Sequence, residues 1–122
     1  MPINDYTDLI VWQKAMDLAV KLGQLTKTLP KDEMFGLALQ LRRCSLSVPS
    51  NIAEGHGRLT RKDYRHFLGN ARGSLSETRT QIHYAVRMGY LDQNVANDVL
   101  KEATVVAKLL NALINSLGDK NS

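Results

Sequence analysis

The chain has little of what secreted and membrane proteins usually carry. It contains one cysteine in 122 residues, so it cannot form an internal disulfide, and nothing in its cysteine content indicates an oxidising compartment. No apolar run approaches the roughly 20 residues that a membrane-spanning helix needs. The first residues lack the positive charge and apolar run of a signal peptide. These absences predict a cytoplasmic protein that does not enter a membrane.

The sequence also lacks the residue patterns of metal sites and active sites. Its three histidines do not fall into a zinc-binding spacing. Cys44 lies on the predicted inward face of its helix with no nearby histidine in sequence, which is typical of a structural thiol. Glu54 and Glu77 form a conceivable carboxylate pair, but no nucleophile or metal signature accompanies them. We therefore predict no enzymatic activity, no metal and no cofactor.

The small number of prolines and aromatic residues favours helix over sheet. Three prolines and 6% aromatic residues accompany many Leu, Ala, Lys, Arg and Gln. Apolar residues recur every three or four positions through four segments, and Thr60 with Asp63 resembles a capping box at the start of the third. The sequence thus predicts one all-α domain, an antiparallel up-down-up-down four-helix bundle. The domain covers residues 1–122, and its helices are expected over about 8–29, 33–55, 61–88 and 93–117.

Arginine and lysine are distributed very differently along the chain. All eight arginines lie between Arg42 and Arg87, whereas seven of the eight lysines lie outside that window. The stretch from Met34 to Leu91 holds nine basic residues and three acidic ones, so the net charge of +4 arises in the middle of the chain. Arginine presents a planar fork of donors that suits phosphate or carboxylate recognition. The charge balance alone does not decide the partner, because many basic proteins bind no nucleic acid.

The third predicted helix has three faces at a turn of about 100° per residue. An apolar stripe is flanked on one side by basic residues: Arg61, Arg65, Arg72, Arg79, His83 and Arg87. On the other side it is flanked by acidic, amide and hydroxyl residues: Asp63, Asn70, Ser74, Glu77 and Gln81. An arginine row of this kind fits a nucleic-acid backbone. It also fits a head-to-tail contact in which the arginine flank of one subunit meets the acidic flank of the next, and the two uses are not exclusive.

The second predicted helix carries a proline among polar residues. Pro49 removes an amide donor inside the helix and is expected to bend it. The polar residues nearby are expected to join the second and third helices in a structural network of Ser47, Asn51, Glu54, Ser74 and Glu77. The alternative is a ligand or nucleic-acid contact at the bend.

The same helix has a second apolar arc beside its inward face. The arc consists of Phe35, Leu39, Leu46 and Ala53. Unless these residues cover the edges of the bundle, part of the arc is exposed, and large exposed apolar patches usually mark interfaces. The arc therefore favours a homo-oligomer.

Three segments resemble a known family. They are DLIVWQKA at residues 8–15, SVPSNIAEG at 47–55 and ARGSLSE at 71–77. They resemble the bacterial four-helix-bundle family of 23S rRNA intervening-sequence proteins, and the resemblance spans about Tyr6 to Leu117. It implies a bundle that assembles as a homopentameric ring, although the biochemical function of this family is poorly defined. Accessory proteins of diversity-generating retroelements are distantly similar. The two resemblances imply two candidate partners, a ribosomal component and a reverse transcriptase.

Residues and resemblance together predict a non-enzymatic, oligomeric protein that binds RNA or DNA through phosphate contacts. The expected contact residues are Arg58, Arg61, Lys62, Arg65, Arg72 and Arg79. The alternative is a scaffold for protein interactions, whose arginine stripe forms subunit or partner contacts without nucleic acid.

Overall fold

The computed structural model describes residues 5–118, which form α-helices and short 3-10 turns and contain no strand. The four α-helices are α1 (Ile10–Leu25), α2 (Leu37–His56), α3 (Arg61–Arg87) and α4 (Gln93–Ser116). The 3-10 turns are η1 (Tyr6–Asp8), η2 (Thr26–Thr28) and η3 (Lys31–Glu33). The predicted all-helical class with four helices is confirmed, while both ends of the predicted domain lie outside the described residues.

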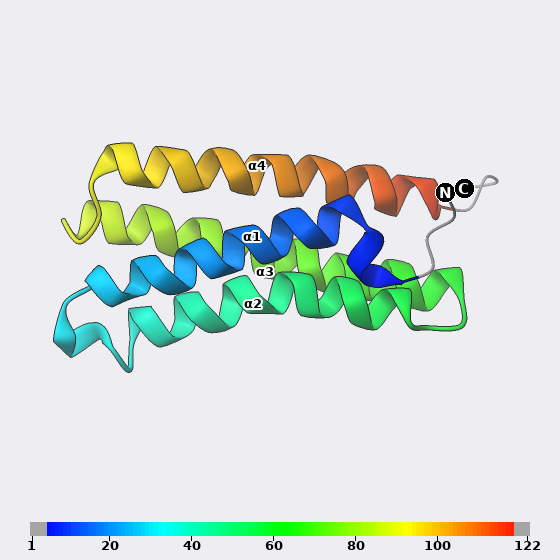
Figure 1. Ribbon diagram of the computed structural model, residues 1–122, viewed down its shortest axis with the longest axis horizontal. Coiled ribbons are helices and arrows are strands. Elements are labelled where there is room, and N and C mark those ends of the chain that lie inside the picture. The colour runs from blue at the N-terminus through cyan, green and yellow to red at the C-terminus, as the bar shows by residue number, and fades with distance from the viewer. Residues whose placement is uncertain (1–4, 119–122) are drawn as a thin grey trace.

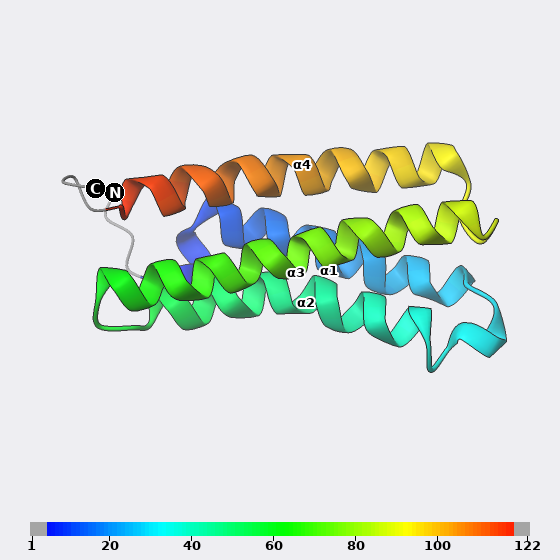
Figure 2. The same ribbon diagram turned by 180° about the vertical axis from the view of Figure 1, so that it is seen from behind.

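The four helices lie side by side along the long axis of the molecule (Figure 1). The colour along the ribbons runs in alternate directions from one helix to the next, and the view from behind shows α3 between α2 and α4 (Figure 2). Each helix packs against its neighbours in the chain, and α1 also packs against α4. Short connections favour this arrangement, because a turn of few residues sends the next helix back along the previous one.

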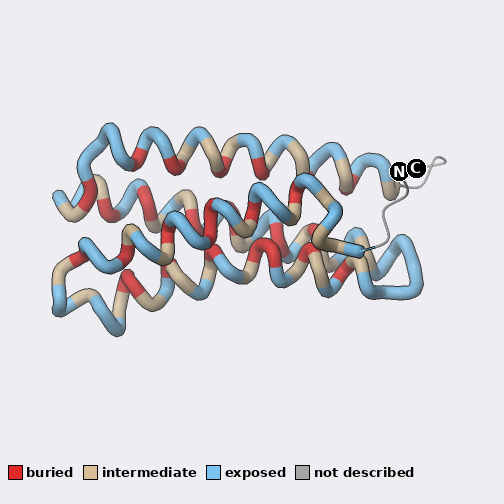
Figure 3. The backbone as a smooth tube through the Cα atoms, in the orientation of Figure 1, coloured by how far each residue is buried: buried red, intermediate tan, exposed pale blue. Residues whose placement is uncertain are grey.

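The apolar stripe of each helix faces the middle of the bundle, where the buried residues gather (Figure 3). The largest fully buried side chains include Leu22, Leu41, Ile52, Leu68, Leu75, Ile82 and Leu110. Burial of each such side chain contributes about 1.5–3 kcal/mol relative to exposure. A smaller cluster closes the end of the bundle where α1 turns into α2, and it contains Leu29, Leu37, Ala38, Ala85 and Leu91.

The first two helices are shorter than predicted. Leu9 has an extended backbone between η1 and α1, so α1 begins at Ile10, and it ends at Leu25, where the chain tightens into η2. The second helix begins only after Gly36, whose backbone angles (φ −106°, ψ −109°) lie outside the helical region. A 3-10 turn also places residues three apart on one side, so a short 3-10 segment can fit the same apolar spacing as an α-helix. The spacing therefore does not show where the α-helix itself begins or ends.

Single residues determine the limits of α3 and the course of α2. Thr60 Oγ1 accepts a hydrogen bond from the Asp63 amide at 3.1 Å, as its place at the start of α3 predicts. Gly89 has a φ of 77°, which allows the chain to reverse from α3 into α4. Pro49 is buried inside α2, and the helix continues through it to His56, so the proline does not divide the helix.

Candidate nucleic-acid interface

Three arginines of α3 lie along the seam between α3 and α4. They are spaced seven residues apart, which returns each to nearly the same side of the helix. Each donates a hydrogen bond across the seam: Arg65 Nε to the Ile114 carbonyl oxygen at 3.3 Å, Arg72 Nη1 to Asn111 Oδ1 at 3.2 Å, and Arg79 Nη2 to Thr104 Oγ1 at 3.4 Å. The predicted arginine stripe therefore runs directly beside α4.

All three acceptors on α4 are neutral groups. The ion pairs among residues 5–118 join Lys21 to Glu102 and Arg58 to Glu54, so none of the three seam arginines pairs with a carboxylate there. A guanidinium has five N–H donors, and each of these arginines uses one of them on α4. Within residues 5–118 the other donors and the full positive charge have no acidic partner and can meet an anion. The bond to α4 also holds the fork in place, which reduces the entropy lost when an anion binds.

Two lysines of α4 extend this positive surface. Lys101 and Lys108 are exposed and seven residues apart, and helical spacing puts them about 60° and 40° around α4 from Thr104, on the outer surface of the helix beside the seam. Asp98 and Glu102 lie about 120–160° from Thr104, on the side toward α1. The two lysines are therefore nearer to the seam than these two acidic residues are. We call the positive surface the basic band, and its members are Arg61, Arg65, Arg72, Arg79 and Arg87 of α3 with Lys101 and Lys108 of α4.

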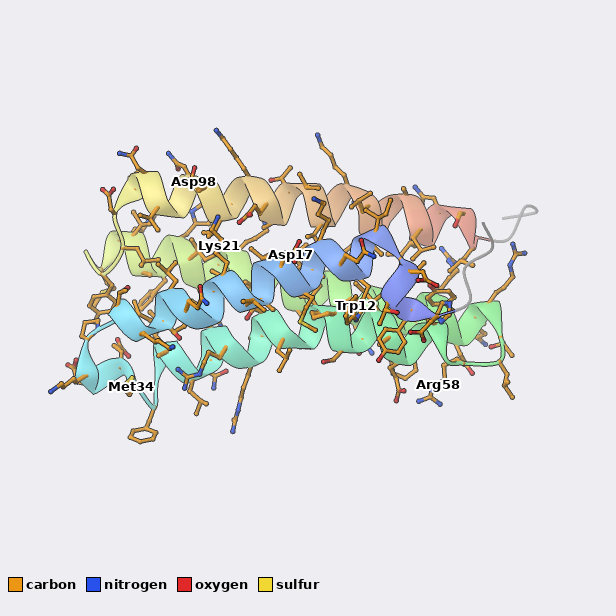
Figure 4. All side chains as sticks on the ribbon, in the orientation of Figure 1. Trp12, Asp17, Lys21, Met34, Arg58 and Asp98 are labelled. Carbon is orange, nitrogen blue, oxygen red and sulfur yellow. The ribbon has the colours of Figure 1, made fainter. Side chains whose placement is uncertain are left out.

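The other two predicted contact residues lie off the basic band. Arg58 is in the turn near the end of α2 (Figure 4), where its Nη2 donates to Glu54 Oε1 at 3.2 Å. Its guanidinium carbon lies 4.5 Å from the centre of the Phe67 ring. Lys62 is exposed and lies about 100° around α3 from Arg61. The predicted set thus divides into four band residues, with Arg58 and Lys62 beside them.

A polar network joins α2 to α3 on the side of α3 away from the basic band. Ser47 Oγ lies 2.7 Å from Ser74 Oγ, and Asn51 Nδ2 donates to Ser47 Oγ at 3.0 Å and to the Ser47 carbonyl oxygen at 2.9 Å. Glu77 makes its contact with Cys44, while Glu54 turns away to Arg58. The structure thus joins Ser47, Asn51 and Ser74 by hydrogen bonds, whereas Glu54 and Glu77 bond to residues outside the predicted network.

Cys44 is half-buried in the seam between α2 and α3, so its placement in the core was wrong. Its thiol donates to Glu77 Oε2 at 3.3 Å and accepts from Gln81 Nε2 at 3.4 Å. Burial raises the pKa of the Cys44 thiol, the bond from Gln81 opposes this, and Glu77 adds to the rise. A protonated thiol is a weak nucleophile, so these contacts suit a structural role. Cys44 and Gln81 were missed as network residues, although both lie one turn from Ser47 or Glu77.

The histidines lie in separate surroundings. The His56 ring meets Tyr64 edge-on at 5.9 Å, and the His66 ring meets Phe67 edge-on at 5.5 Å. Residues 5–118 contain no group of three His, Cys, Asp or Glu side chains that could hold a metal ion. Over the same residues, none of the helices combines the length and apolar character needed to span a membrane.

Comparison with known proteins places the chain in a family. Residues 7–112 match the family described as 23S rRNA-intervening sequence protein. A similar solved structure is that of a protein with unknown function from the S23 ribosomal protein family of Bacteroides thetaiotaomicron, which is 25% identical with a TM-score of 0.81 and covers 87% of this chain and 96% of that one. None of the curated proteins matches the chain significantly. Because the family match covers most of the sequence, the chain belongs to the 23S rRNA-intervening sequence protein family.

Proposed function

We propose that the protein binds nucleic acid through the basic band and carries out no reaction on it. The main support is that Arg65, Arg72 and Arg79 donate hydrogen bonds to neutral groups of α4 and have no carboxylate partner within residues 5–118. An acidic partner across the seam would neutralise the charge of each arginine. Here the positive charge is held in a row and left free, which suits a ligand with repeated negative charges.

The length of the row fits a run of backbone phosphates. Fourteen residues separate Arg65 from Arg79, which corresponds to about 21 Å along α3. One strand of a duplex carries a phosphate every 3.4 Å or so along the axis, so the row spans about six phosphates. Such contacts fix the position of a nucleic acid but do not read its sequence.

RNA is the nucleic acid that we place first, because the family is named for an intervening sequence of 23S rRNA. DNA stays a candidate, since phosphate contacts do not distinguish the two. A ribosomal component or a reverse transcriptase is the kind of protein partner that would present such an RNA, and the cytoplasm is where we expect the complex.

The test is a titration of labelled duplex RNA and duplex DNA at several salt concentrations. Arg72→Gln should weaken binding to both and lower the slope of log K against log salt by about one. Arg43→Gln is the matched control, because Arg43 is exposed on α2 outside the basic band. Wild-type protein that shows no salt-dependent binding would refute the proposal. Equal effects of both substitutions would assign the binding to net charge alone.

We further propose that copies of the chain assemble into an oligomer, as the family resemblance implies, and that they do so through the outer seam between α1 and α2. A shallow, mostly apolar groove there is lined by Met16, Ala19, Val20, Gly23, Arg42 and Leu46. Val20 is 54% exposed and Leu46 is 51% exposed, so water covers apolar surface in the isolated chain. The α1–α2 seam lies opposite the α3–α4 seam in the cycle of helix contacts. A ring built on the first would leave the basic band accessible.

Leu46→Glu tests the assembly by light scattering. We expect the wild type to exceed the 13.6 kDa of one chain several-fold and the variant to approach that mass. Val105→Glu is the control, because Val105 is 46% exposed on α4 outside the groove. If Arg72→Gln dissociated the oligomer instead, the arginines would belong to subunit contacts. The scaffold function without nucleic acid would then be favoured.

A further inference from the structure

A broad trough of about 620 Å³ crosses the outer face of α2 near the end of that helix. It is lined by Ser50, Asn51, Ala53 and Glu54 of α2, by Tyr6 of η1 and by Phe67 of α3. Its size falls in the range of small-molecule sites, which is about 300–1,000 Å³. The combination of two aromatic rings with carboxylate, amide and hydroxyl groups is the combination by which proteins hold unpaired bases.

Two oxygen atoms in the trough are available as hydrogen-bond acceptors. Arg58 occupies Glu54 Oε1, and the Asn51 amide nitrogen is used within α2. Glu54 Oε2 and Asn51 Oδ1 are left without a protein donor among residues 5–118. The Glu54 side chain is 57% exposed, so its charged form stays solvated and ready to accept a bond. The trough therefore offers acceptors to a ligand that brings donors.

Flat surfaces for stacking border these acceptors. The Arg58 guanidinium packs over Phe67 on one face, with 4.5 Å from its carbon to the ring centre. The Arg58 side chain is 44% exposed, and guanidinium planes stack on bases as aromatic rings do, so Arg58 can offer a stacking surface beside the trough. Tyr6 is held edge-on against Trp12, with ring centres 5.4 Å apart. Both surfaces are therefore fixed before a ligand arrives.

We propose that this trough binds an unpaired guanine of the RNA held by the basic band. Guanine presents N1–H and the 2-amino group side by side, and these two donors match a carboxylate oxygen beside an amide oxygen. Adenine, cytosine and uracil each place an acceptor next to their donor on the same edge. That edge is used in a base pair, so only an unpaired guanine can offer it.

The path of an RNA strand from the basic band to the trough is short. Arg58 borders the trough, and Arg61, the first residue of α3 and of the basic band, follows three positions later. A strand leaving the band at Arg61 would pass Arg58 and reach the trough at the same end of the bundle. The inference rests on the proposed nucleic-acid binding, and it adds recognition of one base to contacts that otherwise ignore sequence.

The experiment compares a short oligouridine with the same oligomer carrying one central guanine or one central inosine, which lacks the 2-amino group. Wild-type protein should bind the guanine oligomer about tenfold more tightly than oligouridine, and inosine should lose most of this preference. Glu54→Gln and Tyr6→Leu should each remove the preference and leave oligouridine binding and its salt slope largely intact. Asp98→Asn is the charge control and should keep the preference. The fluorescence of Trp12, the only tryptophan of the chain, should change with guanine and not with uridine.

The outcomes separate the two proposals. Salt-dependent binding of all three oligomers with equal affinity would overturn the guanine site and leave the basic band standing. A guanine preference that survives in both Glu54→Gln and Tyr6→Leu would also overturn it, since the base would then bind elsewhere. Loss of all binding, with no response of Trp12 to guanosine alone, would overturn both.

Discussion

At the scale of single residues, arginine fits the α3–α4 seam for a reason that lysine does not share. Arg72 can donate one N–H to Asn111 and still present further N–H groups to a phosphate, because its donors are spread over a planar fork. A lysine ammonium has its three donors on one atom, so it is less suited to contact α4 on one side and a phosphate on the other. The arginines are therefore placed where contact with α4 and contact with the proposed anion can occur together.

Tyr90 provides a test at the same scale. Its hydroxyl donates to Glu33 Oε2 at 3.0 Å and ties the α3–α4 turn to η3, and this bond raises the pKa of Tyr90. The fold thus favours the neutral phenol, and its contribution is complete below the ordinary tyrosine pKa of about 10 and is lost as the pH rises through the higher folded value. Tyr90→Phe should lower the melting temperature at neutral pH.

Melting temperatures measured over a series of pH values decide whether the Tyr90–Glu33 hydrogen bond causes the difference in stability. The difference in melting temperature between wild type and Tyr90→Phe should shrink as the pH rises above about 10. Tyr84→Phe is the comparison, because Tyr84 is 48% exposed and its hydroxyl has no hydrogen-bond partner within residues 5–118. A difference that stays constant across the series would mean that the ring packing of Tyr90 matters and its hydroxyl does not.

The arginine stripe could be predicted from the sequence, whereas the residues facing it could not. Helical geometry alone puts Arg65, Arg72 and Arg79 on one side of α3. Which α4 residues oppose them depends on the register of two helices, and the register depends on the Gly89 turn and on core packing. For the same reason Lys101 and Lys108 were outside the predicted site.

At the scale of elements, apolar spacing predicts that a helix exists better than it predicts where the helix ends. The extents of α3 and α4 lie close to their expected ranges, because Thr60 and Gly89 are strong local signals. The ends of α1 and α2 differ because η1, η2 and η3 use the same apolar residues in tighter turns.

Two glycines test how closely α2 and α3 approach. A β-carbon at Gly55 would lie 2.9 Å from Phe67 Cβ and 3.1 Å from the Tyr64 carbonyl oxygen, so Gly55→Ala should force the helices apart and cost about 1–3 kcal/mol of unfolding free energy. Gly73 has nothing within 4 Å of the corresponding position, so Gly73→Ala should add about 0.5–1 kcal/mol through helix propensity.

Urea unfolding of the two variants measures both changes in the free energy of unfolding, the expected loss for Gly55→Ala and the expected gain for Gly73→Ala. Opposite shifts of the midpoint with an unchanged slope would support the close contact at Gly55. A stabilised or neutral Gly55→Ala protein would show that α2 and α3 can separate at no cost. The contact would then not account for the glycine at the end of the SVPSNIAEG segment.

At the scale of the whole molecule, charge and apolar surface lie on opposite seams. The basic band follows α3 and α4, and the apolar groove follows α1 and α2. This separation puts the proposed nucleic-acid binding and the proposed self-assembly on different surfaces, whereas the sequence offered one arginine stripe for both uses. It also means that the net charge of +4 understates the local charge that a ligand meets.

The most direct test of the basic band is the salt dependence of RNA binding by two double variants that lose the same charge. Lys101→Gln/Lys108→Gln removes two band lysines of α4, and Lys27→Gln/Lys31→Gln removes two exposed lysines beside the α1–α2 turn. The first pair should lower the slope of log K against log salt by about two, and the second should leave the slope near the wild-type value. Equal slopes for the two double variants would contradict a phosphate-binding band along α3 and α4.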